Sequence, residues 1–187
     1  MVTRALEQRN ALSGRRAIEA GRRATVRVAD DCARFSLRVG AADREAAGRA
    51  LGLSLAGRIG SVATAGGRTA LCLGPDEWAI IAPAGEAEAV RQGFAGLGAP
   101  HSLVETSHRD VGIEVIGPAA EQMLSAACAL DLGAMPAGSC TRTIFDRAAV
   151  MLVKHGPDHY RIEVWQSFAS HVWGLLEAVS REVALDI

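Results

Sequence analysis

The chain has 187 residues, of which 49% are hydrophobic and 22% are charged, and its formal net charge is −1. This length allows one large or two small globular domains, and this balance excludes the disordered and fibrous classes. The apolar runs are too short to cross a bilayer and no secretory signal is recognised, so we expect neither a membrane partner nor export.

The first 23 residues form a basic arm, with six arginines against two glutamates, and the rest of the chain is acidic. Three interpretations of residues 1–23 stay open: a solvated tail, a segment that wraps a partner chain, and a transit peptide, which the glutamates disfavour. Binding of nucleic acid through the arm is a further hypothesis that the shortness of the arm and its lack of interleaved aromatic residues disfavour, so nucleic acid is not the predicted partner.

The four cysteines are widely spaced, and no C-x-x-C pair is present. Without a secretory signal, they are expected to be small buried side chains in a reducing compartment. We therefore expect a cytoplasmic protein.

The first half of the chain predicts a strand, a helix, further strands and a closing helix. Asp43 is a candidate N-cap of the first helix and Gly52 its end, and Gly66-Gly67 suits a hairpin turn because paired glycines supply positive φ values. The predicted elements are a strand over 35–40, a helix over 42–51, strands over 61–65 and 68–73, a strand from Trp78, and a helix over 86–97 with Val90, Phe94 and Leu97 on one face.

The second half repeats this order. Pro118 occupies the first position of a predicted helix, a position that proline tolerates, and Ser167 is a candidate N-cap of the last helix. The predicted elements are a strand over 111–117, a helix over 118–128, strands over 140–145 and 149–154, a strand from Tyr160, and a helix over 168–183 with Phe168, Val172, Leu175, Leu176, Val179 and Val183 on one face.

Two Gly-Pro-Asp turns mark equivalent points of the two halves. Gly74-Pro75-Asp76 leads through Trp78 into one strand, and Gly156-Pro157-Asp158 leads through Tyr160 into another. The repeat length of about 80 residues is too long for a solenoid. The sequence therefore predicts an α+β fold of two related halves, residues 24–100 and 101–187, that form one unit.

The motifs that mark catalytic and cofactor sites are absent from the sequence. It has no G-x-G-x-x-G after a strand, no Walker-type loop and no G-x-S-x-G elbow. His155 and His159 have the spacing of a helical metal pair, but Gly156 and Pro157 between them prevent a helix. We therefore predict no catalytic, cofactor-binding or metal-binding residue in this chain.

Ser107 and His108, in the polar segment 106–110, are the residues that most resemble a catalytic nucleophile and base. If this segment is extended, adjacent side chains point to opposite faces and cannot act as nucleophile and base. The favoured interpretation is a polar entry to a strand, and an interface or ligand contact is the alternative.

Several short segments follow one another in a specific order: Leu73-Gly74-Pro75-Asp76-Glu77-Trp78, Ser107-His108-Arg109, Gly117-Pro118-Ala119, Leu124, Cys128-x-Leu130-Asp131-Leu132, Gly138, Arg142-Thr143, Ser167-Phe168-Ala169, Trp173 and Leu176. Taken together in this order, they resemble the γ subunit family of heterotetrameric sarcosine oxidase. The resemblance covers most of residues 30–180. One departure is Gln166, where the family usually has arginine.

The resemblance implies a fold like that of the folate-binding aminomethyltransferase (T-protein) of the glycine cleavage system. It implies a structural subunit, without catalysis of its own, that packs against the large (α) subunit of a complex. The other subunits are expected to hold FAD, FMN, NAD and tetrahydrofolate. The complex is expected to demethylate sarcosine to glycine, with hydrogen peroxide and formaldehyde or methylenetetrahydrofolate as products.

Two alternatives to this function stay open. One is a folate-binding or aminomethyltransferase-like protein that acts alone, since fold does not imply function. The other is a subunit of a related N-methyl amino acid demethylase, for which the difference at Gln166 leaves room.

Overall fold

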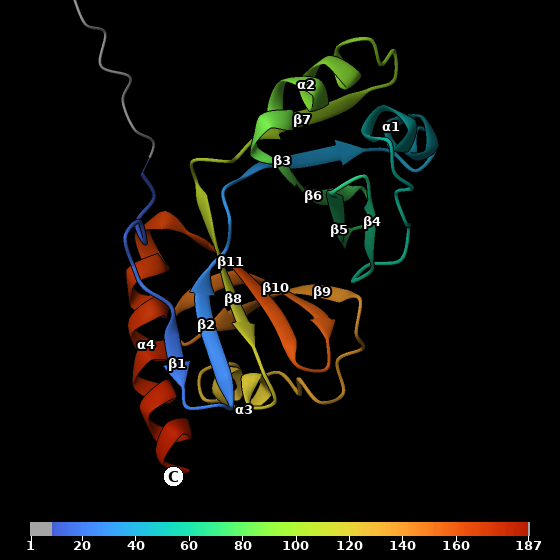
Figure 1. Ribbon diagram of the computed structural model, residues 1–187. Coiled ribbons are helices and arrows are strands. Elements are labelled where there is room, and N and C mark those ends of the chain that lie inside the picture. Colours follow the sequence, from blue (N-terminus) through green and yellow to red (C-terminus); the bar gives the residue numbers. More distant parts are fainter. Residues whose placement is uncertain (1–8, 187) are drawn as a thin grey trace, which may run out of the picture.

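The computed structural model describes residues 9–186 and contains two antiparallel sheets with helices on their outer faces (Figure 1). The five-stranded sheet consists of β3 (Cys32–Val39), β4 (Val62–Ala65), β5 (Arg68–Gly74), β6 (Glu77–Pro83) and β7 (His101–Glu105), in the order β4-β5-β6-β3-β7. The six-stranded sheet consists of β1 (Ile18–Ala20), β2 (Ala24–Val28), β8 (Asp110–Ile116), β9 (Ser139–Phe145), β10 (Ala148–Gly156) and β11 (His159–Trp165), in the order β1-β2-β8-β11-β10-β9.

Each sheet has its own hydrophobic core, and each core is closed by two helices. Helix α1 (Arg44–Leu51), the 3₁₀ turn η1 (Ala84–Glu86) and helix α2 (Ala87–Ala95) cover the five-stranded sheet, whose core contains Phe35 and Trp78. Helices α3 (Ala120–Ser125) and α4 (Gln166–Leu185) cover the six-stranded sheet, whose core contains Tyr160 and Trp173. A small third cluster of Leu71, Cys140 and Val153 lies between the sheets. The predicted α+β fold of two related halves is confirmed.

The first strand of each half, β2 in residues 24–100 and β7 in residues 101–187, pairs with the sheet of the other half. β2 pairs with β8, with Val26 opposite Val115, and β7 pairs with β3, with Leu103 opposite Leu37. The sheets therefore cross the expected boundaries: residues 24–28 lie in the sheet of the second half and residues 101–105 in that of the first. Because of this exchange, neither half completes its sheet without the other.

Both Gly-Pro-Asp segments are hairpin turns with an irregularity at the same place. The register of β5 and β6 shifts between Cys72 and Gly74, and that of β10 and β11 shifts between Lys154 and Gly156. Each shift is a bulge in the strand that enters the turn. This match supports the duplication that the sequence predicts.

In the first half, the predicted hairpin turn and helix end lie where expected, whereas the predicted cap bond of Asp43 is not formed and α2 ends at Ala95 rather than at residue 97. Gly66 and Gly67 form the hairpin turn between β4 and β5 with φ values of 57° and 79°. Gly52 ends α1 in the left-handed conformation, where its backbone N–H bonds to Arg49 and Gly48 carbonyls. Asp43 stands at the N-cap of α1 but makes no side-chain capping bond.

The helices of the second half begin differently from the prediction. Helix α3 starts at Ala120, so Pro118 precedes it, because Gly117 has a φ of 126° and the Ala119 N–H bonds to the Arg23 carbonyl. Helix α4 follows β11 directly with Trp165 as its N-cap, which places Ser167 inside the first turn.

The face of α4 that was predicted to be apolar is only partly buried, since Leu175 and Val179 are partly buried residues that pack against the core. Val172, Leu176 and Val183 are buried, whereas Phe168 is exposed. The first turn of the helix therefore extends beyond the hydrophobic core, which the later turns cover, and leaves the Phe168 side chain exposed.

The described part of the basic arm packs against the body of the chain. Leu12 and Ala20 are buried in the second-half core, and β1 extends the six-stranded sheet beside α4. Arg23 forms an ion pair with Asp186 after the end of α4. For residues 9–23 the interpretation as a solvated tail is therefore wrong; the part of the arm before residue 9 lies outside the described residues.

All four cysteines carry free thiols, and Cys72, Cys128 and Cys140 are buried, as predicted. Cys32 is partly exposed. Within residues 9–186, no helix is both long enough and apolar enough to cross a membrane.

Candidate functional site

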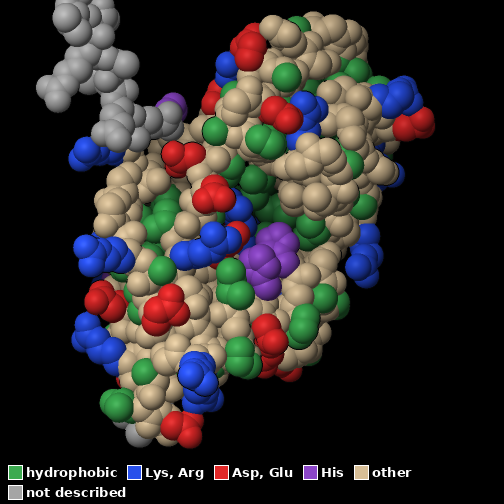
Figure 2. Space-filling view, viewed as in Figure 1, with side chains coloured by type: hydrophobic (Ala, Val, Ile, Leu, Met, Phe, Trp, Pro, Cys, Tyr) green, Lys and Arg blue, Asp and Glu red, His purple; other side chains and the backbone are tan. Residues whose placement is uncertain are grey.

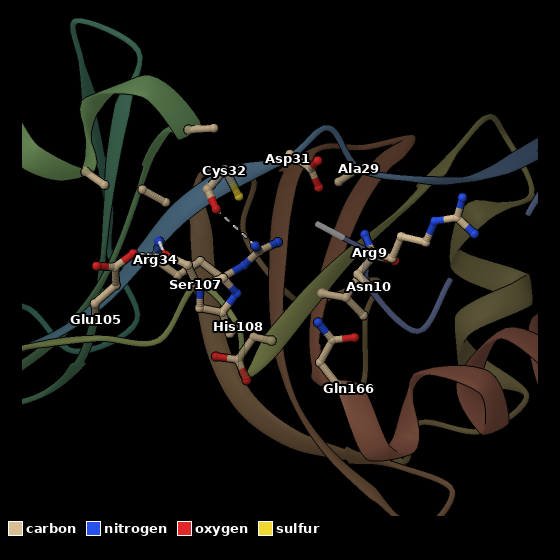
Figure 3. Close-up of a pocket in the computed structure, with 15 residues that line it drawn as sticks. Arg9, Asn10, Ala29, Asp31, Cys32, Arg34, Glu105, Ser107, His108 and Gln166 are labelled. Carbon is tan, nitrogen blue, oxygen red and sulfur yellow. Dashed lines mark hydrogen bonds between the residues drawn. The ribbon is translucent and has the colours of Figure 1, made fainter. Parts of the chain in front are cut away.

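A cavity of about 170 Å³ lies where the arm, the two halves and the start of α4 meet (Figure 3). Asn10 comes from the arm, Cys32 from the start of β3, Ser107 and His108 from the loop between β7 and β8, and Gln166 from α4. Pockets for drug-sized ligands have volumes of about 300–1,000 Å³. The cavity is therefore too small for a flavin or a folate.

Buried charges beside this cavity join the two halves. The Nε of Arg34 on β3 donates a hydrogen bond of 2.6 Å to Glu163 on β11, and the Nε of Arg161 donates one of the same length to the other carboxylate oxygen. The side chains of Glu163 and Arg34 are 0% and 8% exposed. Both oxygens of a fully buried carboxylate are thus bonded to guanidinium groups, which offsets the desolvation of its charge.

The sequence contains a signal for this cluster that the motif search missed. In β11 the charged residues Arg161 and Glu163 alternate with buried Ile162 and Val164 on a strand in the middle of a sheet. Charges at such positions require partners, because buried ions are otherwise very costly. The sequence could not indicate that the partner is Arg34, which lies 129 residues away.

Cys32 is a poor nucleophile despite its position in the cavity. Its sulfur accepts a hydrogen bond of 3.3 Å from Arg161. Burial nevertheless raises the pKa of the Cys32 thiol above its usual value and outweighs the opposite effect of the nearby arginines. The thiol stays protonated at neutral pH, and the reactive form of cysteine is the thiolate.

The hydroxyl group of Ser107 makes two hydrogen bonds where the two halves meet, one with a backbone N–H and one with a side chain. Its hydroxyl accepts a hydrogen bond of 3.0 Å from the Arg34 N–H and donates one of 2.8 Å to Glu105. Residues 107–109 form a turn before β8, so the segment is not extended, but it is a polar entry to a strand with local hydrogen bonds, as the favoured interpretation has it. With its hydroxyl held in this way, Ser107 is a structural residue of the β7–β8 loop.

Arg109, next in the same turn, lies against two other residues. Its guanidinium binds Asp110, with 3.0 Å between Nη2 and the carboxylate, and lies 5.8 Å from the centre of the Trp165 ring. The basic residue of the Ser-His-Arg segment therefore points to the side of the molecule that carries Trp165.

The two histidines around the second Gly-Pro-Asp turn lie side by side. The ring centres of His155 and His159 are 4.8 Å apart, and burial lowers the pKa of His155. Figure 2 shows histidine and basic side chains together in the hollow between the two halves. Among the described residues, no group of three His, Cys, Asp or Glu side chains is arranged to hold a metal ion.

Gln166 makes two bonds within the chain. Its side-chain oxygen accepts a hydrogen bond of 2.6 Å from the Ala11 N–H, and its own backbone N–H donates to the Arg109 carbonyl at 2.8 Å. Gln166, the residue that departs from the family pattern, therefore connects the start of α4 to the arm and to the β7–β8 loop through hydrogen bonds.

A larger hollow of about 660 Å³ lies beside α1, away from these residues. It is lined by eight residues of α1 and the segment after it, among them Arg44, Glu45 and Arg49. It lacks the combination of nucleophile, base and oxyanion donors that defines a catalytic site.

The sequence matches the model of the "Sarcosine oxidase, gamma subunit family" over residues 38–182, which is more than three quarters of the chain. The chain belongs to this family. The match includes both Gly-Pro-Asp turns and the segments around Ser107 and Ser167 from which the resemblance was inferred.

Two curated relatives carry the name of this family. The sarcosine oxidase γ subunit of Arthrobacter sp is 39% identical over 94 residues, which are 50% of this chain and 46% of that one. The γ subunit of Corynebacterium sp. (strain P-1) is 34% identical over 136 residues, 70% of this chain and 66% of that one. The matched segments thus span between about half and about two thirds of these relatives.

The solved structures agree with the family and the fold. A chain of the heterotetrameric sarcosine oxidase from Corynebacterium sp. U-96 superposes with a TM-score of 0.80 and 26% identity, over 89% of this chain and 88% of that one. The glycine cleavage system aminomethyltransferase T from Bartonella henselae superposes with a TM-score of 0.61 and 16% identity, over 83% of this chain and 46% of that one. The second likeness confirms the expected relation of fold and carries no statement about activity.

Proposed function

We propose that this chain is the γ subunit of a heterotetrameric sarcosine oxidase and that it has a structural role in the complex. The observation that supports the proposal best is the superposition with a subunit-sized chain of such an enzyme over nearly its whole length. Family membership and the likeness to two curated γ subunits support it further.

The complex would oxidise the N-methyl group of sarcosine. Sarcosine, dioxygen and water give glycine, formaldehyde and hydrogen peroxide; two electrons leave the substrate and reduce dioxygen. When tetrahydrofolate takes the one-carbon unit, methylenetetrahydrofolate replaces formaldehyde and no water is consumed. FAD, FMN, NAD and tetrahydrofolate belong to the other subunits in this proposal, and the complex works in the cytoplasm.

The site chemistry of this chain supports a structural role. The buried cluster of Arg34, Glu163 and Arg161 is neutralised within the chain, and Ser107 is held by its neighbours. The cavity between the halves is too small for the cofactors named above. These features stabilise a junction and leave the redox chemistry to the partner subunits.

Purification of the tagged chain from its native cell tests the proposal. A flavoprotein with a yellow spectrum should purify with the chain, and the complex should release peroxide with sarcosine. A chain that purifies alone would overturn the proposal. Faster turnover of another N-methyl amino acid than of sarcosine would instead favour the related demethylase.

A folate-binding protein that acts alone is the second candidate, supported by the fold it shares with aminomethyltransferase T. The three tryptophans allow a direct test with the isolated chain. A saturable change in their fluorescence on addition of tetrahydrofolate supports this candidate, and an unchanged signal favours the structural subunit.

A further inference from the structure

An apolar row crosses the face of the six-stranded sheet that points away from α3 and α4. Trp165 lies opposite Asp110, and Ala149 lies opposite Ile144. Because Val164 pairs with Val150, the next residues along these two strands, Trp165 and Ala149, are also neighbours. Trp165, Ala149 and Ile144 therefore follow one another across β11, β10 and β9.

This row forms a groove between two large exposed side chains. Trp165 and Ile144 are 51% and 52% exposed. Trp165, Ala149 and Met151 line a hollow of about 300 Å³, and Ile144 lies next to Ala149 at the edge of this hollow. Trp165 and Ile144 stand two strands apart, which is a span of about 10 Å. The groove is thus wide enough for one inserted apolar side chain.

The groove continues a surface that is buried elsewhere in the molecule. Farther along the same face, Val153 and Cys140 are packed against Leu71 of the five-stranded sheet. The five-stranded sheet covers that part and leaves the row at Trp165 uncovered. Soluble proteins rarely leave large apolar side chains grouped in this way unless another surface covers them.

Two arginines give the rim of the groove a positive charge. Arg109 and Arg142 both line it and are about half exposed. The two carboxylates that also line it, Asp110 and Glu163, are buried, with side chains 2% and 0% exposed, and Glu77, which binds Arg142, is 13% exposed. The outer surface therefore presents guanidinium groups, which favour a partner that carries a carboxylate. Tryptophan and arginine are also the residue types that dominate binding energy at protein interfaces.

We propose that this groove, formed by Trp165, Ala149, Ile144 and Met151 with Arg109 and Arg142 at its rim, docks a segment of another oxidase subunit. That segment presents an apolar side chain next to a carboxylate. The inference rests on the proposed function, because it names the surface through which the subunit joins its complex. A second copy of this chain fits less well, since a symmetric contact would bring the arginines of both copies together.

Co-expression with the other oxidase subunits tests the groove with a matched pair of variants. Ile144→Asp places a charge at the edge of the groove, beside Ala149, and Ile59→Asp places the same charge at an isoleucine that is 60% exposed elsewhere. Trp165→Ala removes the ring without adding a charge. The affinity of each purified variant for the remaining complex is measured, together with its melting temperature and its elution volume alone.

The groove variants should bind at least about 30-fold more weakly than the wild type, while Ile59→Asp binds normally and all melting temperatures stay close. Normal binding of both groove variants overturns the proposal. So does a wild-type dimer that Ile144→Asp dissociates while subunit binding is unchanged. If the wild type binds no oxidase subunit at all, the proposed function itself fails, which is a different result.

Discussion

Arg34 on β3 and Glu163 on β11 form a buried ion pair of 2.6 Å that joins the two halves of the molecule. The apolar cluster between their sheets is small: it contains three buried side chains and four partly buried ones that pack against them. The ion pair therefore adds a buried polar contact to a small apolar interface between the two halves.

Removal of Arg34 should destabilise the whole chain. The variant Arg34→Met leaves Glu163 buried with Arg161 as its remaining guanidinium, and breaking a buried pair in this way costs about 3–5 kcal/mol. The free energy of unfolding in urea measures the loss. Arg49→Met, which breaks an exposed pair with Glu45, is the control and should change it by less than about 0.5 kcal/mol. Equal effects of the two variants would contradict the role of the buried pair.

Gly117 should tolerate alanine far less well than Gly40, although both end equivalent strands. Gly117 has a φ of 126°, and an added Cβ would lie 2.5 Å from the Arg23 carbonyl oxygen, whereas the same atom at Gly40 meets nothing within 4 Å. Gly117→Ala should lower the stability by more than about 2 kcal/mol, and Gly40→Ala should change it by less than about 1 kcal/mol. Thermal unfolding of both variants would reveal the difference, and similar melting temperatures would refute it.

Glu77 should make the stability depend on pH in the acidic range. The hydrogen bond from Arg142 lowers the pKa of Glu77 below its ordinary value of 4.5. A carboxylate with a lowered pKa in the folded state contributes its full stabilisation above the unfolded value, and the contribution is lost as the pH falls through the folded value. The difference in unfolding free energy between the wild type and Glu77→Gln should therefore shrink as the pH falls below about 4.5. A difference that stays constant from pH 7 to pH 3 would show that Glu77 is not involved.

The buried cysteines should resist alkylation in the native protein. Burial raises the pKa of Cys140 to about 11, so only about one thiol in a thousand is ionised at pH 8. Iodoacetamide at that pH should leave Cys72, Cys128 and Cys140 unmodified, with slow reaction at the partly exposed Cys32, and all four thiols should react in guanidinium. Mass spectrometry of tryptic peptides gives the extent at each site. Rapid native modification of Cys140 would contradict its burial.

Local patterns in the sequence determined the units from which this protein is built. The paired glycines at 66 and 67, the helix end at Gly52 and both Gly-Pro-Asp hairpins lie where predicted, because turns and caps depend on a few adjacent residues. The order of these units established the duplication and, with the quoted segments, the family.

Only the tertiary structure decided how the units combine. Strand β7 was not predicted, since His101, Ser102, Val104 and Glu105 are exposed at the edge of a sheet and show no apolar alternation. Its pairing with β3 and the pairing of β2 with β8 exchange strands between the halves, and hydrogen bonds between distant backbones leave no mark in the sequence. The same holds for Glu163 and its partner Arg34, and for the row of Trp165, Ala149 and Ile144, which strand register alone brings together.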